Sequence, residues 1–164
     1  MAIQINYNKN TKKQSNSNLV LFVDEKFNIH SLKNHLSSSE YNFISDLLKV
    51  RDLKRKITNF DLNSKKKIIL ISLAKNLSNS DAENLGAKFY DNFKDLKQRD
   101  FIINSDTVKF KSNNVIGYFL HGLKLKSYTF DKYKTKKNKN NFSIYIDGNN
   151  KPTLKDQIKF NAIE

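Results

Sequence analysis

Two short apolar runs constrain the fold of this chain more than any other feature: LVLFV at residues 19–23 and KKIILISL at residues 66–73. Both are rich in apolar β-formers and lack the polar and apolar alternation that marks a strand with one face in water. Continuous runs of this kind are typical of strands that helices cover on both faces. They predict a layered domain in which a sheet lies between helices.

Four further segments extend the predicted sheet. Alternation in the N-terminal segment AIQINY places Ile3, Ile5 and Tyr7 on one face, as in an edge or half-buried strand. Weaker strand candidates occur at residues 56–62, 100–104 and 142–147. The chain therefore predicts a sheet of about six strands.

Two amphipathic segments with N-terminal capping signals predict helices. The clearest covers residues 78–98, where Ser80 with Glu83 forms a candidate capping box. A second covers residues 38–50, with Ser37 and Glu40 as its box. The residues expected to face the core are Leu85, Phe89, Phe93 and Leu96 in the first helix, and Tyr41, Ile44 and Leu48 in the second.

Two more helices are expected in the C-terminal half. Residues 113–127 place four apolar side chains on one face: Ile116, Phe119, Leu120 and Leu123. The final segment, residues 152–164, has Thr153 with Asp156 as a candidate box and Ile158 and Ala162 at a helical interval. It ends without the Gly, Pro or basic last turn that usually closes a helix.

Strands that alternate with helices predict the α/β class, as a three-layer α/β/α sandwich with a mixed sheet. The length of 164 residues matches one domain. A domain of this size can hide about 70% of its unfolded surface. One core is therefore sufficient.

The formal charge of +14 favours phosphate-rich or membrane partners at first sight. However, only Arg51, Arg55 and Arg99 are arginines among the 30 basic residues. Arginine is the side chain whose planar fork suits bidentate phosphate and guanine contacts. Asparagine is also abundant, at 23 residues, so part of the charge reflects a bias of the whole sequence toward Lys, Asn and Ile.

Composition excludes several classes of chemistry. The chain has no cysteine, which rules out disulfides, thiolate metal sites and a cysteine nucleophile. Its longest apolar run is far shorter than the roughly 18 residues of a membrane span, and its N-terminus lacks the apolar region of a signal peptide. We therefore expect a cytoplasmic protein without a membrane partner.

Catalytic motifs are also missing from the sequence. The three histidines, His30, His35 and His121, do not form an HExxH motif, and four glycines are too few for a Gly-rich cofactor loop. Asp24 and Asp147 directly follow predicted strands, where open α/β sheets bind ligands. We interpret the histidines as surface or hydrogen-bonded residues, and the two aspartates as turn formers or helix caps.

One segment carries a family resemblance. HGLKLKSYTFDKYKTKK, from His121 to Lys137, resembles the segment G-x-x-L-x-S-Y-x-F-x-x-Y-K-T-K-K in the N-terminal domain of leucyl aminopeptidases, the cytosol aminopeptidase family (peptidase family M17). The matching residues are Gly122, Leu125, Ser127, Tyr128, Phe130, Tyr133, Lys134, Thr135, Lys136 and Lys137. Of these, Tyr128, Phe130 and Tyr133 are expected to pack in the core or at the helix end, and the lysines to be exposed.

Neighbouring segments agree with this resemblance in their order. KKIILISLAK is similar to a basic pair, an apolar strand and a G-L-G-K turn, NLGAKFYDNFK to the following helix, and DQIKFNAIE to the start of a linker helix. The resemblance thus spans nearly the whole chain from Leu19 onward. One departure is the turn from Ser72 to Lys75, where serine and alanine replace both glycines.

The resemblance implies a macro-domain-like N-terminal domain at residues 1–151 and the start of a linker helix at residues 152–164. In the family, a separate C-terminal domain holds two divalent metal ions, zinc or manganese, and all catalytic residues. This chain would then carry no catalytic, cofactor-binding or metal-binding residues. Its partners would be its own catalytic domain and the neighbouring subunits of a homo-hexamer, and the full-length parent would remove N-terminal amino acids from peptides.

A near-copy of the family's catalytic signature also occurs. NSDAE at residues 79–83 resembles the start of N-T-D-A-E-G-R, but Asn84 and Leu85 replace Gly-Arg. Asp81 and Glu83 lie two apart on a first helical turn and point in different directions. Helix capping and the helix dipole account for both acids.

Two other functions remain open from the sequence. A basic segment beside Phe130 and Tyr133 would suit a nucleic-acid-binding module; its lysines are Lys132, Lys134, Lys136, Lys137 and Lys139. A stand-alone macro-like domain could instead bind an ADP-ribose type of nucleotide, although the scarcity of glycine counts against a phosphate-binding loop.

Overall fold

The computed structural model describes residues 3–7, 17–109, 114–132, 142–149 and 152–161. The strands are β1 (Ile3–Asn6), β2 (Asn18–Val23), β3 (Ile57–Asp61), β4 (Lys67–Ser72), β5 (Asp100–Asn104) and β6 (Phe142–Asp147). The helices are α1 (Ser38–Val50), α2 (Asn79–Phe93), α3 (Val115–Lys132) and α4 (Leu154–Asn161). Two short 3₁₀ helices, η2 (His30–Asn34) and η3 (Ser105–Thr107), lie in the connections.

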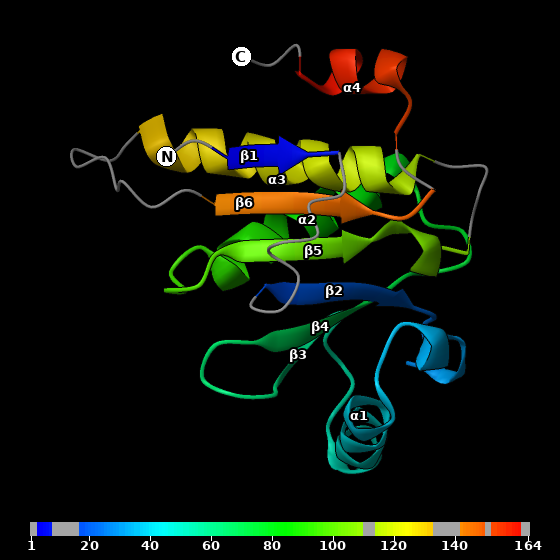
Figure 1. Cartoon of the computed structure of the whole chain (residues 1–164). Coiled ribbons are helices and arrows are strands. Elements are labelled where there is room, and N and C mark those ends of the chain that lie inside the picture. Colours follow the sequence, from blue (N-terminus) through cyan, green and yellow to red (C-terminus); the bar gives the residue numbers. More distant parts are fainter. Residues whose placement is uncertain (1–2, 8–16, 110–113, 133–141, 150–151, 162–164) are drawn as a thin grey trace.

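The strands form one mixed sheet of six strands in the order β1-β6-β5-β2-β4-β3 (Figure 1). Every neighbouring pair is parallel except β3 and β4. The short connection between β3 and β4 permits an antiparallel hairpin, whereas parallel pairs need longer crossovers. The predicted α/β class and all six predicted strands are confirmed.

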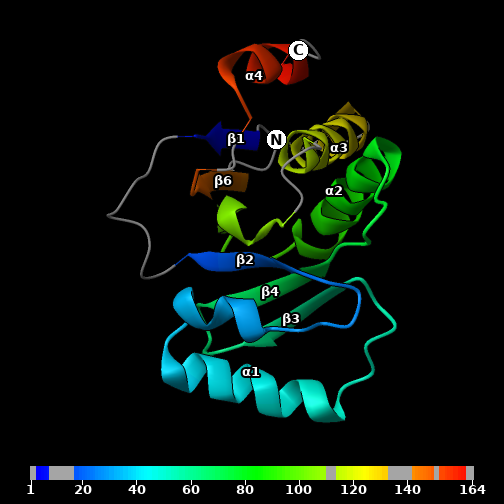
Figure 2. The same cartoon turned by 90° about the vertical axis from the view of Figure 1, so that its right-hand side faces the viewer.

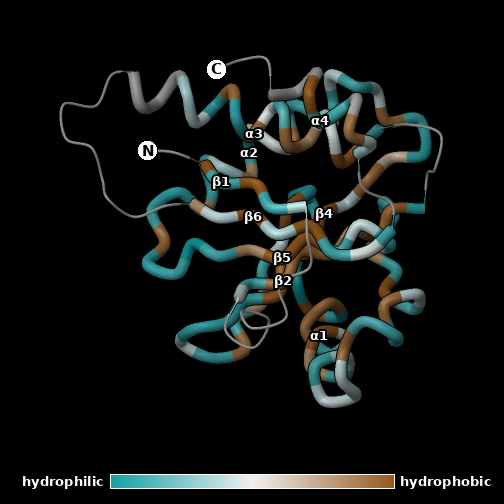
Figure 3. Tube along the Cα trace, turned by 45° about the horizontal axis from the view of Figure 1, so that its top comes forward, coloured by the Kyte–Doolittle hydropathy of each residue, from teal (hydrophilic) through white to brown (hydrophobic). Residues whose placement is uncertain are grey.

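Helices lie on both faces of the sheet. Helices α2 and α3 cover one face and α1 lies against the other (Figures 1 and 2). Strand β2 shows both contacts, because Val20 and Phe22 join the cluster under α2 and α3 while Leu21 and Val23 join the cluster under α1. The prediction from the apolar run at residues 19–23 is therefore correct, and Figure 3 shows hydrophobic residues gathered along the central strands.

An aromatic group fills the larger core. The ring of Phe89 on α2 lies 5.1 Å from Phe101, 5.5 Å from Phe119 and 6.3 Å from Phe142, measured between centroids. These pairs have the edge-on geometry that aromatic rings prefer. They connect α2 with α3 and with strands β5 and β6, so this layer is fixed by large buried side chains.

Two glycines bring the backbones of α2 and α3 into contact. A Cβ atom on Gly86 would overlap the carbonyl group of Phe119, and one on Gly122 would overlap the carbonyl group of Glu83 and lie 2.7 Å from its Cα. Any larger residue at either position would push the helices apart. The close crossing therefore requires glycine on both sides.

Capping boxes start α1 and α2. At α1 the Ser37 hydroxyl accepts a hydrogen bond from the Glu40 N–H, and Glu40 accepts one from the Ser37 N–H, as predicted. The box predicted for α2, Ser80 with Glu83, is wrong. Ser78 is the N-cap and pairs reciprocally with Asp81, so Ser80 lies inside the first turn.

Helix α3 is longer than predicted, and its extension leaves the core. The four predicted core residues of α3, from Ile116 to Leu123, are buried, but Tyr128 is 61% exposed. The expectation that Tyr128 packs in the core is therefore wrong, because the helix continues past the face that it shares with α2. The side chains of Phe130 and Tyr133 lie outside the described residues.

Helix α4 contacts α3 beyond the β1 edge of the sheet (Figures 1 and 2). Thr153 accepts a hydrogen bond from the Asp156 N–H at 3.3 Å, as the predicted cap requires. Two apolar side chains on α4, Leu154 and Ile158, are 77% and 73% exposed. Ala162 lies outside the described residues. Among the described helices, none is long and apolar enough to cross a membrane.

Replacing Gly122 with alanine is expected to lower the free energy of unfolding by about 2 kcal/mol or more, because the helices must separate to admit the new Cβ. The gain in helix propensity, about 1 kcal/mol, is too small to offset this loss. Urea unfolding followed by circular dichroism measures the change. Asn84→Ala, at an exposed position of α2, is the control and should stay within about 0.5 kcal/mol. Unchanged stability of Gly122→Ala would contradict the close crossing.

Replacing Ser78 with alanine is expected to destabilise the protein by about 1 kcal/mol through loss of the cap. Ser80→Ala is the matched control and should stay within about 0.5 kcal/mol.

Hydrogen bonds from Ser78, first from its side chain and then from its backbone, hold the pKa of Asp81 below its usual value. Because the pKa of Asp81 is lowered in the folded state, its ionised carboxylate stabilises the fold at pH values above the unfolded-state pKa. This stabilisation is lost as the pH falls through the folded-state pKa. The difference in stability between wild type and Ser78→Ala should therefore shrink in acid. Urea unfolding at neutral pH and at a pH below the pKa of free aspartate tests this. Equal effects of Ser78→Ala and Ser80→Ala would contradict the assignment of the cap.

Candidate functional site

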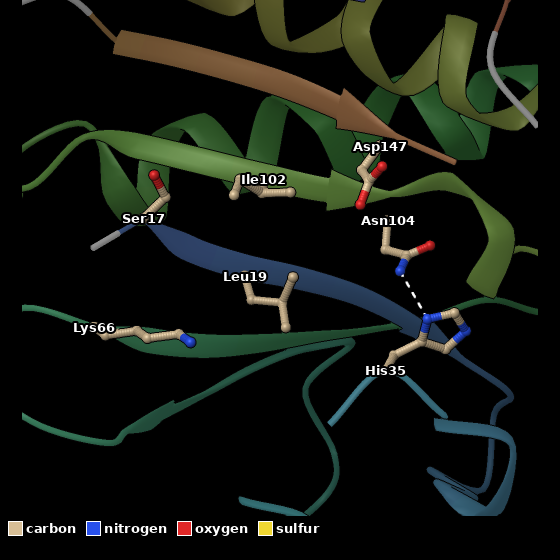
Figure 4. A pocket seen from close by; sticks show the side chains of 7 residues that line it. All are labelled: Ser17, Leu19, His35, Lys66, Ile102, Asn104 and Asp147. Carbon is tan, nitrogen blue, oxygen red and sulfur yellow. Dashed lines mark hydrogen bonds between the residues drawn. The ribbon is translucent and has the colours of Figure 1, made fainter. Parts of the chain in front are cut away.

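A pocket of about 290 Å³ opens on the α1 side of the sheet, beside the central strand β2 (Figure 4). Seven described residues from five separate parts of the chain line it: Ser17, Leu19, His35, Lys66, Ile102, Asn104 and Asp147. The cluster under α1 takes its buried strand residues from β2, β3 and β4. The pocket therefore lies where that cluster ends and the face of β5 and β6 begins.

Strand register explains why these side chains share a face. Leu19 is paired with Ile102, and Asn104 is paired with Asp147. Because alternate residues of a strand point to the same face, Ile102 and Asn104 both project to the α1 side. Leu19 and Ile102 form an apolar floor, and Asn104 and Asp147 form a polar wall at the carboxyl ends of β5 and β6.

His35 closes the carboxyl end of the pocket. The Asn104 amide nitrogen lies 2.9 Å from His35 Nδ1, and the Asn104 amide oxygen accepts a hydrogen bond from the Asp106 N–H at 3.0 Å. With Asn104 as the donor, Nδ1 accepts and the proton of the neutral ring is on Nε2. The backbone of His35 is held by a 2.9 Å hydrogen bond to the carbonyl of Leu32. The wall is thus tied to both β5 and η2.

Opposite charges lie at the two ends of the pocket, as Figure 4 shows. At one end, Lys66 Nζ is 3.6 Å from an oxygen of Glu40, in a loose pair that is largely shielded from solvent. At the other end, one oxygen of Asp147 accepts the Gly148 N–H at 2.9 Å. The second oxygen of Asp147 has no hydrogen-bond donor among the residues that the structure describes.

The structure brings two of the residues singled out from the sequence, His35 and Asp147, into this pocket. The other candidates lie elsewhere. One oxygen of Asp24 accepts hydrogen bonds from the N–H groups of Lys26 and Asn28, as the turn interpretation predicts. His30 is exposed at the start of η2 and takes no part in the pocket.

His121 lies on the other side of the sheet, between α2 and α3. Its Nδ1 is 2.8 Å from an oxygen of Glu83, so this acid of the NSDAE segment pairs with a residue of the neighbouring helix. Asp81 is occupied by the cap of α2. Within the described ranges, no group of three or more His, Asp or Glu residues is arranged to hold a metal ion.

Sequence reasoning missed Ser17, Lys66 and Asn104. Asn104 carried a readable signal, because it ends a predicted strand as Asp147 does, and side chains at strand carboxyl ends commonly line ligand sites. Lys66 and Ser17 precede their strands and carry no such signal. The basic segment from Tyr133 to Lys139 lies outside the described residues, and nothing in the structure tests it.

Comparisons with known proteins give the fold a context. No family model matches the sequence, and no curated protein matches it. Among solved structures, a mutant of tomato leucine aminopeptidase superposes with a TM-score of 0.67 at 18% identity, over 98% of this chain and 35% of that one. The macrodomain of Thermus aquaticus DarG superposes with a TM-score of 0.54 at 9% identity, over 90% of this chain and 99% of that one.

These similarities establish a fold and leave the activity open, because both identities are low. The chain spans about a third of the length of the aminopeptidase that it matches. It also spans nearly the whole of a macrodomain. The architecture is therefore a macro-like α/β sandwich that a larger aminopeptidase also contains.

Proposed function

We propose that this chain is the N-terminal, non-catalytic domain of a leucyl aminopeptidase. The observation that carries the proposal is the superposition on tomato leucine aminopeptidase, which covers 98% of this chain but only 35% of that enzyme. A match that covers nearly all of one chain and about a third of the other is expected when the shorter chain corresponds to one domain of a two-domain enzyme. The segment from His121 to Lys137, which resembles the family by sequence, supports the same assignment independently.

The structure gives physical roles to two residues of that segment. Gly122 is the glycine that admits the backbone of α2 at the helix crossing. Ser127 is buried, and its hydroxyl donates a 2.7 Å hydrogen bond to the carbonyl of Lys124. Both roles concern packing, which suits a scaffold rather than a reaction centre.

We assign the chemistry of the parent to a separate C-terminal domain. A two-metal centre needs several converging ligands, whereas the acids of the NSDAE segment face a helix cap and a histidine. In this proposal, residues 1–151 form the macro-like domain and residues 152–164 begin the linker helix. The parent uses two divalent ions, zinc or manganese, in the cytoplasm to remove N-terminal amino acids from peptides.

The domain would serve the assembly of a homo-hexamer and shape access to the active sites. Helix α4 supplies one observation in support. Leu154 and Ile158 are one turn apart and strongly exposed, so α4 presents an apolar face. The catalytic domain or a neighbouring subunit would cover this face in the assembled enzyme.

Reading the gene beyond codon 164 is the first test. The proposal expects a continuous reading frame that contains an intact NTDAEGR motif and the remaining metal ligands. A stop codon directly after Glu164 would overturn it. The full-length protein should release amino acids from a leucyl substrate when zinc or manganese is added, and the 164-residue chain should release none.

Assembly gives a second readout from the same proteins. Sedimentation of the full-length protein should show a hexamer, and deletion of residues 1–151 should produce smaller species. A hexamer that persists after this deletion would remove the assembly role. It would leave the assignment of the domain itself intact.

Two alternatives stay predictions. A nucleic-acid-binding module depends on the basic segment beyond Lys132, which the structure does not describe. Where lysines are described, six of them pair with carboxylates, which lowers the charge available to phosphate: Lys49, Lys54, Lys66, Lys67, Lys94 and Lys126. A stand-alone nucleotide-binding macrodomain is favoured by the match to nearly all of the DarG macrodomain.

A further inference from the structure

We propose that the pocket beside β2 binds a short peptide of two or three residues with free termini. The peptide carboxylate would lie at Lys66 and the peptide ammonium at Asp147. This inference rests on the described pocket alone and holds whether or not the chain belongs to an aminopeptidase.

The charges of the pocket select a ligand that carries both signs. Lys66 is only loosely paired, at 3.6 Å from Glu40. The other oxygen of Glu40 accepts the Ser37 N–H at 3.1 Å, so the helix cap holds Glu40 in place. A ligand carboxylate can thus reach Lys66 without breaking the start of α1.

The opposite end offers an acceptor for a cation. One oxygen of Asp147 is committed to the Gly148 N–H, and the other has no donor within the described part of the chain. Figure 4 shows the Asp147 carboxylate directed toward Asn104, on the pocket side of the strand. An ammonium group placed there would form a charge-assisted hydrogen bond.

The separation of the two ends fits a short extended chain. Continued past the paired residues, the register places Lys66 beside Ser17 and Asn104 beside Leu21, about 13 Å apart along the strands at 3.3 Å per residue. Lys66 and Asp147 are also separated across the sheet by three strand spacings of about 4.8 Å, from β4 to β6, so their backbones lie about 20 Å apart. The two side chains and their hydrogen bonds to the ligand cover the part of this distance that the ligand does not. The long side chain of Lys66 runs into the pocket and shortens this distance (Figure 4). Two or three extended residues span about 7–11 Å.

The floor and the volume agree with this length. Leu19 and Ile102 offer apolar contact between the charged ends, and Asn104 offers an amide for a peptide group. A volume of about 290 Å³ lies at the lower limit of sites for drug-sized ligands, which begin at about 300 Å³. A nucleotide as large as ADP-ribose is too large to be enclosed.

The test is calorimetric titration of the 164-residue chain with the tripeptide Ala-Leu-Ala. Two modified ligands, the N-acetylated and the C-amidated tripeptide, each remove one charge. Two variants, Asp147→Asn and Lys66→Gln, remove the matching charges on the protein. Asp95→Asn and Lys65→Gln are the matched controls, since both residues are exposed and lie outside the pocket.

Each single removal of a charge, on either side, should weaken binding about tenfold, as expected for a hydrogen bond to a charged group. Removing a charge from the peptide and removing its partner from the protein should not weaken binding twice. The N-acetylated peptide should bind Asp147→Asn and wild type equally, and the amidated peptide should bind Lys66→Gln and wild type equally. The control variants should bind as wild type does.

Two results would overturn the proposal: no heat at millimolar tripeptide, or equal binding of all three ligands. Thermal unfolding checks that each variant is folded. Should Asp147→Asn unfold because the Gly148 contact is disturbed, the modified ligands on wild-type protein still decide the outcome.

Discussion

The backbone contact between α2 and α3 is the constraint on which the larger core depends. Gly86 and Gly122 let each helix approach the carbonyl groups of the other, which holds Phe89 and Phe119 against the sheet. With wider separation, these rings could not contact one another and the strands at once. Two residues without side chains therefore determine how the large side chains pack.

The two faces of the sheet are covered differently, and this difference positions the pocket. Helices α2 and α3 pack against strands across the sheet, whereas the cluster under α1 draws its strand residues from β2, β3 and β4. On the α1 side, the register places polar residues such as Asn104 and Asp147 beyond the edge of that cluster. A pocket with an apolar floor and charged ends follows from this boundary, and four of its lining side chains, Leu19, Ile102, Asn104 and Asp147, belong to strands.

Much of this fold was readable from the sequence because its signals were local. The continuous run at residues 19–23 predicted a strand buried on both faces, and Ser37 with Glu40 predicted the start of α1. The start of α2 was misread because two overlapping Ser-x-x-acid patterns occur in SNSDAE. In the structure Ser78 and Asp81 form the cap, while Glu83 lies 2.8 Å from His121 of α3, a contact between helices that the local pattern does not reveal. The pocket was not predictable for a similar reason, since Lys66, Asn104 and Asp147 meet only through the register of separate strands.

A shared fold leaves the role of this chain to its sites and surfaces. One protein with this fold is part of a longer aminopeptidase and another is a complete macrodomain. Leu154 and Ile158 on α4 are exposed apolar side chains, and they are a surface feature of this chain that the shared fold does not explain. The pocket beside β2 is a second such feature, because the register of separate strands brings Leu19, Ile102, Asn104 and Asp147 together on the α1 face of the sheet.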